Sequence, residues 1–278
     1  MNRRITALNI FPIAMAATLL PLARADDNDS WQGDFTVLMA EGDAGETIPC
    51  RLLRPPAGAG QPSEPTTLRY PLVIFLHGAG ERGNDNRAQL KHGVAEFHRR
   101  RGQNPCFLLA PQCPSGDRWV EVDWDAASGS GTFPDRPSMP LRTVWSAVEK
   151  LLETEPIDAD RIYVTGLSMG GYGTWFAAAH YRRRVAAASP VCGGGDPAWA
   201  DRYRGLPMWA VHGIEDSAVP VERTREMVRA IREAGGSIGV TEYPGVGHDS
   251  WTPFYADDQF HRWLFAQRRT DPAPANPN

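Results

Sequence analysis

The sequence has few cysteines, and their spacing is unlike that of a metal site. Only four occur among 278 residues: Cys50, Cys106, Cys113 and Cys192. No Cys-x-x-Cys pair or close Cys/His set is present, so we expect no zinc site, and no motif calls for another metal or an organic cofactor. The run between Cys106 and Cys113 predicts an extended strand, which would hold those two thiols too far apart to bond. Any other pairing stays open.

Long apolar runs are also missing after the N-terminus, so we expect no membrane span in the mature chain. The first residues differ in kind. Arg3 and Arg4 supply positive charge, residues 10–23 are mostly apolar, and Ala23 and Ala25 are small residues at the cleavage-defining positions. This pattern predicts a signal peptide over residues 1–25 and an exported protein, periplasmic or extracellular, by the general or the twin-arginine route. An uncleaved anchor is the alternative, but two prolines interrupt a run that is already short.

Positive charge is not in excess. The formal net charge is −4, and removing a signal peptide with three arginines and no acid leaves −7 for the mature chain. An acidic chain of this kind is a poor match for nucleic acid, so we expect no nucleic-acid partner.

No repeat or linker divides the chain, and we expect one catalytic domain over residues 26–269, followed by a Pro/Asn-rich and disordered tail at 270–278. Short apolar runs alternate with helical spacing, which predicts an α/β fold: a mostly parallel central sheet with helices on both faces. The strand-like runs cover residues 72–76, 107–110, 162–165, 185–191, 208–211 and 240–243. The helical patterns cover residues 141–152, 172–180, 221–231 and 260–265, and residues 34–39 and 47–53 predict an antiparallel hairpin.

A possible nucleophile stands between a strand and a helix. Gly166-Leu167-Ser168-Met169-Gly170 is a G-x-S-x-G pentapeptide that follows the strand-like run 161–165 and precedes the helical run 172–180. A tight turn there lifts a serine hydroxyl clear of the backbone, and the two glycines leave room for it. A plain glycine-rich turn is the alternative. We expect Ser168 to be a nucleophile.

An acid and a base follow in the order that such a nucleophile requires, each after a strand. Asp216 comes 48 residues after Ser168, and Glu215 is a close competitor for the same role. His248 comes 32 residues after Asp216, behind the last strand-like run. The other histidines that we weighed fit worse by position: His77, His212 and His261.

An oxyanion hole is expected before the serine. Leu76-His77-Gly78-Ala79-Gly80 follows the first central strand, and its small residues let backbone N–H groups approach a substrate oxygen. One donor comes from that loop and the other from the residue after the nucleophile. The candidates are the N–H groups of Ala79 and Met169.

Four segments carry a resemblance to a known family: residues 76–83, 109–114, 160–171 and 247–251. With these motifs the chain resembles α/β-hydrolase serine esterases, in a group related to polyhydroxyalkanoate depolymerases, predicted secreted peptidases and prolyl-oligopeptidase catalytic domains. The similarity runs from about Tyr70 to Leu264. It implies an α/β-hydrolase fold and carboxylic ester hydrolysis, with nucleophile, acid and base at Ser168, Asp216 and His248.

The substrate is expected to be a small-molecule or polymeric ester. Only residues 192–207 are available for a lid, so we expect no large lid and no preference for long-chain lipids. Aromatic residues of the long loop at 113–140 and of the segment after His248 are candidates for lining an open cleft: Trp119, Trp124, Trp251 and Tyr255. Arg82 is a candidate contact for an anionic substrate group, or a surface ion pair. A serine peptidase, a polyester depolymerase and a non-catalytic binding protein are the alternatives.

Overall fold

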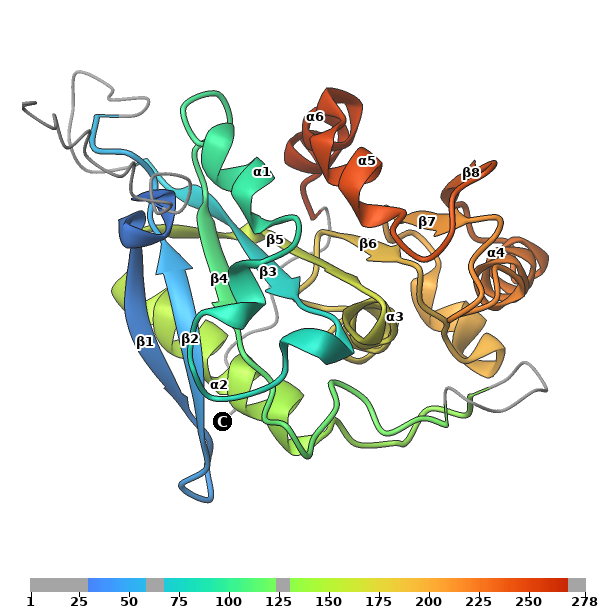
Figure 1. Cartoon of the computed structure of the whole chain (residues 1–278), viewed down its shortest axis with the longest axis horizontal. Helices are drawn as coiled ribbons and strands as arrows, with labels where there is room; N and C mark the ends of the chain where they lie inside the picture. The colour runs from blue at the N-terminus through green and yellow to red at the C-terminus, as the bar shows by residue number, and fades with distance from the viewer. Residues whose placement is uncertain (1–29, 59–67, 124–130, 270–278) are drawn as a thin grey trace, which may run out of the picture.

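The computed structural model describes residues 30–58, 68–123 and 131–269. Its strands, in chain order, are β1 (Phe35–Glu41), β2 (Thr47–Leu53), β3 (Tyr70–Leu76), β4 (Phe107–Pro111), β5 (Ile157–Leu167), β6 (Ala187–Val191), β7 (Trp209–Gly213) and β8 (Gly239–Tyr243). They form one eight-stranded sheet with the order β1-β2-β4-β3-β5-β6-β7-β8 (Figure 1). β2 is antiparallel to β1 and to β4, and the pairs from β4 to β8 are parallel. The predicted hairpin and the mostly parallel sheet are confirmed.

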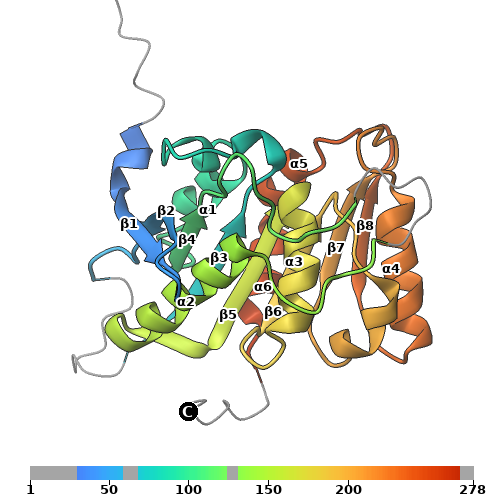
Figure 2. The same ribbon diagram turned by 90° about the horizontal axis from the view of Figure 1, so that it is seen from below.

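Helices cover both faces of the sheet, as expected. They are α1 (Val94–Arg99), α2 (Met139–Thr154), α3 (Met169–His180), α4 (Glu222–Glu233), α5 (Trp251–Ala256) and α6 (Asp258–Ala266). Helices α2, α3 and α4 lie on one face, and α1, α5 and α6 lie on the other (Figures 1 and 2). Short 3-10 helices add η1 (Ser30–Asp34), η2 (Ala79–Glu81), η3 (Ala88–Leu90) and η4 (Pro197–Tyr203).

Strand β3 shows why the central strands are apolar without alternation. Leu72, Ile74 and Leu76 point into the hydrophobic cluster on the side of α2 and α3. Val73 and Phe75 point into the cluster under α1, α5 and α6. Both faces of a central parallel strand are covered, so every side chain must be apolar.

The segment between β6 and β7 carries no large lid. Residues 192–207 are all described, and their one regular element is η4, which packs against α3 and α4 through the buried side chains of Trp199 and Tyr203.

Some predictions differ from the structure in extent or lie outside it. The short helices α1 and α5 were not expected, and β6 begins at Ala187 rather than at residue 185. The predictions for residues 1–25 and 270–278 concern residues outside the described part. Within the described ranges, no helix combines the length and apolar character that a membrane span requires.

Candidate active site

Ser168 occupies the turn between β5 and α3. Its backbone has φ 54° and ψ −117°, a conformation that L-residues rarely adopt. A Cβ on Gly166 or on Gly170 would overlap the backbone carbonyl oxygen of Leu76. The two flanking glycines are therefore needed because the turn packs directly on β3, and the turn holds the serine side chain away from its own backbone.

Ser168, His248 and Asp216 form one chain of hydrogen bonds. The Nε2 atom of His248 lies 2.9 Å from the Oγ of Ser168, and its Nδ1 lies 2.7 Å from the Oδ2 of Asp216. A carboxylate only accepts, so Nδ1 carries the proton and Nε2 is left to accept from the serine hydroxyl. The three side chains come from the ends of β5, β7 and β8, which meet at one edge of the parallel sheet.

Asp216, and not its neighbour Glu215, is the acid that reaches the histidine. The Asp216 side chain is fully buried, whereas Glu215 is exposed. The Oδ1 of Asp216 accepts from the backbone N–H groups of Ala218 and Val219, each at 2.9 Å. Burial alone would raise the pKa of Asp216, but hydrogen bonds from His212 and His248 outweigh it and hold that pKa well below its ordinary value. The carboxylate is therefore ionised.

His212 is a contact of the acid that the sequence analysis missed. Its ring is fully buried at the end of β7, with Nε2 3.3 Å from the Oδ2 of Asp216. The only sequence signal was a histidine at a strand end, four residues before the acid, and its position had placed it behind His248 as a candidate.

The expected oxyanion donors lie at two helix starts. Ala79 begins η2 and Met169 begins α3, and the first N–H of a helix has no partner within the helix. Neither N–H donates a hydrogen bond to another residue in the part of the chain that the structure describes. Both groups thus lack a partner among the described residues and stay candidates for the oxyanion hole.

His77 fixes the loop that carries Ala79. Its Nε2 accepts the N–H of Cys113 at 2.9 Å, so Nδ1 is the protonated nitrogen and donates to the carbonyl of Gly78 at 2.6 Å. Burial lowers the pKa of His77 to about 4, which keeps the ring neutral. The indole N–H of Trp119 donates to the carbonyl of His77 at 3.0 Å.

Two of the aromatic residues proposed to line a cleft do not do so. Trp119 is fully buried beneath the oxyanion loop, where it supports His77. Tyr255 is also fully buried, and its hydroxyl is 2.9 Å from the Oγ1 of Thr165. Both expectations are corrected, because an aromatic in a loop or a short helix can serve as core when its face meets the sheet. Trp124 lies outside the described residues.

Trp251 and Arg82 do lie beside the site. The ring of Trp251 packs edge-to-face on His248, with centroids 5.3 Å apart, and it also lies 5.4 Å from the ring of His92. The guanidinium of Arg82 is half-buried and donates from Nε to the carbonyl of Ala79 at 2.9 Å. Arg82 therefore stabilises the oxyanion loop through this hydrogen bond.

All four cysteines are free and buried, and none is in a disulfide. Burial raises the pKa of Cys50 and of Cys106 to about 12, so these thiols stay protonated. Cys192 lies closest to the site, where its Sγ accepts the N–H of Ser168 at 3.3 Å.

The atoms around Cys192 include a set with metal-like spacing. Its Sγ, a carboxylate oxygen of Asp216 and a ring nitrogen of His248 all lie within 4.8 Å of one another. The carboxylate and the imidazole already bond to each other, and burial raises the pKa of the Cys192 thiol, which opposes the thiolate that a metal needs. We interpret this group as the surroundings of the hydrogen-bonded chain.

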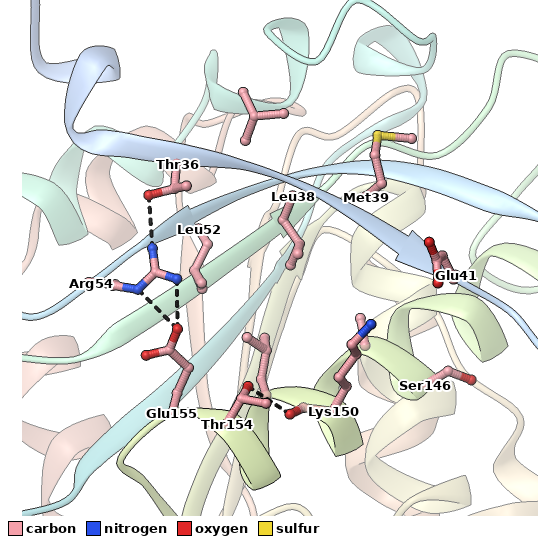
Figure 3. Close-up of a pocket in the computed structure, with 13 residues that line it drawn as sticks. Thr36, Leu38, Met39, Glu41, Leu52, Arg54, Ser146, Lys150, Thr154 and Glu155 are labelled. Carbon is pink, nitrogen blue, oxygen red and sulfur yellow. Dashed lines mark hydrogen bonds and ion pairs between the residues drawn. The ribbon is translucent and has the colours of Figure 1, made fainter.

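A separate hollow of about 250 Å³ lies at the far side of the sheet, between β1 and α2 (Figure 3). Apolar side chains such as Leu38 and Leu52 line it, and the ion pair of Arg54 with Glu155, at 2.6 Å, closes one end. It contains no residue of the hydrogen-bonded chain or of the oxyanion loop, so we assign it no part in the chemistry.

Comparison with known proteins finds similarity to several hydrolases. The model of the dienelactone hydrolase family matches residues 134–258, a segment that contains Ser168, Asp216 and His248. An uncharacterized secreted protein of Arthroderma benhamiae is 26% identical over 238 residues, which cover 73% of this chain and 24% of that protein. The poly(3-hydroxyalkanoate) depolymerase C of Paucimonas lemoignei is 28% identical over 130 residues, 45% of this chain and 28% of the enzyme.

Among solved structures, a thermostable esterase is 40% identical and superposes with a TM-score of 0.76, covering 86% of this chain and 64% of the esterase. The chain thus spans about a quarter of the secreted relative and under two thirds of the esterase. The chain thus has an α/β-hydrolase fold and is similar to an esterase, to the dienelactone hydrolase family and to a polyhydroxyalkanoate depolymerase.

Proposed function

We propose that this chain is a secreted serine hydrolase that cleaves carboxylic esters through an acyl-enzyme on Ser168. One observation carries the proposal: the continuous hydrogen-bonded chain from the Oγ of Ser168 through His248 to Asp216, beside two backbone N–H groups that have no partner among the described residues. A nucleophile, a base with an orienting acid, and donors for an oxyanion are the parts that acyl transfer needs.

In the first step the Oγ of Ser168 attacks the ester carbonyl carbon, and the Nε2 of His248 takes the hydroxyl proton. The carbonyl electron pair moves onto its oxygen, which the N–H groups of Ala79 and Met169 stabilise. The bond to the alcohol oxygen then breaks, and that oxygen leaves with the proton from His248. The product of this step is an ester between the acyl group and Ser168.

In the second step a water molecule takes the place of the alcohol. His248 removes its proton as the water oxygen attacks the acyl carbon, and the oxyanion returns to the same two N–H groups. The bond to the Oγ of Ser168 breaks and the serine recovers its proton. Asp216 stays ionised throughout, because its lowered pKa favours the charged form beside the imidazolium.

The substrate class that we propose is supported by the short segment between β6 and β7. With only η4 in the segment 192–207, we propose small-molecule or polymeric esters rather than long-chain triglycerides. Trp251 is the proposed apolar contact, since its ring already borders His248. Arg82 is the proposed polar contact at the oxyanion loop.

Export belongs to the same proposal. The composition of residues 1–25 supports a cleaved signal peptide, and a relative described as secreted is consistent with it. N-terminal sequencing of the protein recovered from outside the cytoplasm of an expressing bacterium should give Asp26 as the first residue. A mature protein that begins at Met1 contradicts this part.

The activity is tested with p-nitrophenyl acetate and its amide counterpart p-nitroacetanilide. We expect the wild-type chain to cleave the ester much faster, and Ser168→Ala to lose at least about a thousandfold of kcat while keeping its circular dichroism spectrum. Ser146→Ala, on α2 and far from the site, is the matched control and should retain wild-type turnover. Faster cleavage of the amide would favour the peptidase alternative, and an active Ser168→Ala would overturn the assignment.

A further inference from the structure

His212 has a defined set of partners on three sides. On β7, its Nε2 is 2.9 Å from the carbonyl oxygen of Val219 and 3.3 Å from the Oδ2 of Asp216. Its Nδ1 is 2.8 Å from the Oγ1 of Thr224 on α4. That hydroxyl is also 3.1 Å from the carbonyl of Gly193, behind the start of α3. The ring therefore connects the acid loop to α4 and, through Thr224, to the segment after β6.

The partners fix where the ring carries its hydrogen. A carbonyl and a carboxylate are both acceptors, so Nε2 of His212 carries the hydrogen, with the carbonyl of Val219 as the nearer acceptor and the Oδ2 of Asp216 as a longer contact. The other nitrogen, Nδ1, contacts the Thr224 hydroxyl, whose single hydrogen can bond either Nδ1 or the carbonyl of Gly193. The ring is fully buried, and water cannot replace either contact.

Three hydrogen bonds and one longer contact surround the Asp216 carboxylate. Two backbone N–H groups bond Oδ1, whereas Oδ2 lies 2.7 Å from Nδ1 of His248 and 3.3 Å from Nε2 of His212. If only Oδ1 were held, the carboxylate could still rotate and move Oδ2 toward or away from His248. The Nε2 of His212, which the rigid strand β7 holds in place beside Oδ2, restricts that rotation.

We propose that His212 is a positioning residue, which donates from Nε2 to Asp216 and so aims the carboxylate at His248. The inference rests on the proposed function and deepens it, because it adds a residue behind the acid that sets how well the serine is activated. His212 does not touch the substrate, so its loss lowers kcat and leaves KM near its wild-type value.

The test compares two side chains of nearly equal shape. His212→Gln keeps an N–H that can reach Asp216 and Val219, whereas His212→Met fills the same space without a donor. We expect Met to lower the rate of fluorophosphonate labelling of Ser168 by about tenfold or more, and Gln to restore most of it. Hydrolysis of p-nitrophenyl acetate should show the same ranking in kcat with unchanged KM.

Labelling separates failure of this inference from failure of the proposed function, because it depends on serine activation and not on the choice of ester. A wild-type chain that is not labelled overturns both. A labelled wild type with Met and Gln variants that react equally fast overturns the role of His212 alone. If His212→Met does not fold, Thr224→Val loosens the ring from the opposite side; an unchanged labelling rate there also overturns the inference, and a reduced rate supports it.

Discussion

The Nε2 of His248 lies 2.9 Å from the Oγ of Ser168, although 80 residues separate them in the chain. Strands β6 and β7 stand between the strands that end beside these two residues. Their contact therefore depends on the spacing of four neighbouring parallel strands, which hold the nucleophile and the base on one edge of the sheet.

Replacing each of the two neighbouring acids, Asp216 and Glu215, should show which one supports His248. Asp216→Asn removes the charge that stabilises the imidazolium and offers His248 the wrong hydrogen-bonding group, so we expect kcat to fall by about 10³- to 10⁴-fold. Glu215→Gln is the matched control, because its side chain is exposed, and it should keep wild-type kcat. Steady-state kinetics on p-nitrophenyl acetate measures both, and equal losses in the two variants would contradict the assignment of the acid.

The strained backbone at Ser168 should lower the free energy of unfolding. Both Ser168→Gly and Ser168→Ala remove the nucleophile, but only glycine adopts φ 54° and ψ −117° without a Cβ clash. We expect the glycine variant to have the higher free energy of unfolding, by about 1 kcal/mol. Urea denaturation compares them, and an alanine variant as stable as the glycine variant would show that the turn is not strained.

Close packing under the turn predicts that alanine is far more destabilising at Gly170 than at Gly80. A Cβ at Gly170 would overlap the carbonyl of Leu76, whereas a Cβ at Gly80 meets nothing within 4 Å. Gly170→Ala should lower the free energy of unfolding by about 1–3 kcal/mol or more, since α3 must move away from β3. Gly80→Ala should leave thermal stability almost unchanged. Similar melting temperatures for the two variants would exclude this packing.

Two buried histidines should make the protein less stable in mild acid. Burial lowers the pKa of His77 and of His261 to about 4, whereas an unfolded histidine has about 6.5. Between these values the unfolded chain binds protons that the folded chain does not. The free energy of unfolding therefore falls as pH drops from about 6.5 to 4, by up to about 1.4 kcal/mol per pH unit for each histidine.

His261→Gln tests this pH dependence directly. The Nε2 of His261 donates to the carbonyl of Tyr255 at 2.8 Å, and glutamine keeps such a donor without the titratable ring. Between pH 4 and 6.5, the unfolding free energy of this variant should change less steeply with pH, by up to about 1.4 kcal/mol per pH unit, because one fewer proton is bound on unfolding. Urea titrations at several pH values give the slope, and an unchanged slope would show that His261 titrates alike in both states.

The order of Ser168, Asp216 and His248 could be predicted because each follows a strand, and parallel strands bring their ends together. The side chains that support them could not. Whether Trp119 lines a cleft or fills the space under His77 depends on which face the loop turns to the sheet, and sequence spacing does not encode that. His212 was missed because its contact with Asp216 depends on how the turn after β7 folds back, which the sequence spacing does not show. Helix α1 was missed because six residues are too few to show a helical period.

The central claim is that Ser168 is the activated nucleophile. The most direct measurement is intact-mass and peptide mapping of the wild-type chain after reaction with a fluorophosphonate. We predict one adduct per chain, on the peptide that contains Ser168, formed as esterase activity is lost and absent from Ser168→Ala. An adduct on another residue, or full activity in a chain labelled at Ser168, would contradict the account.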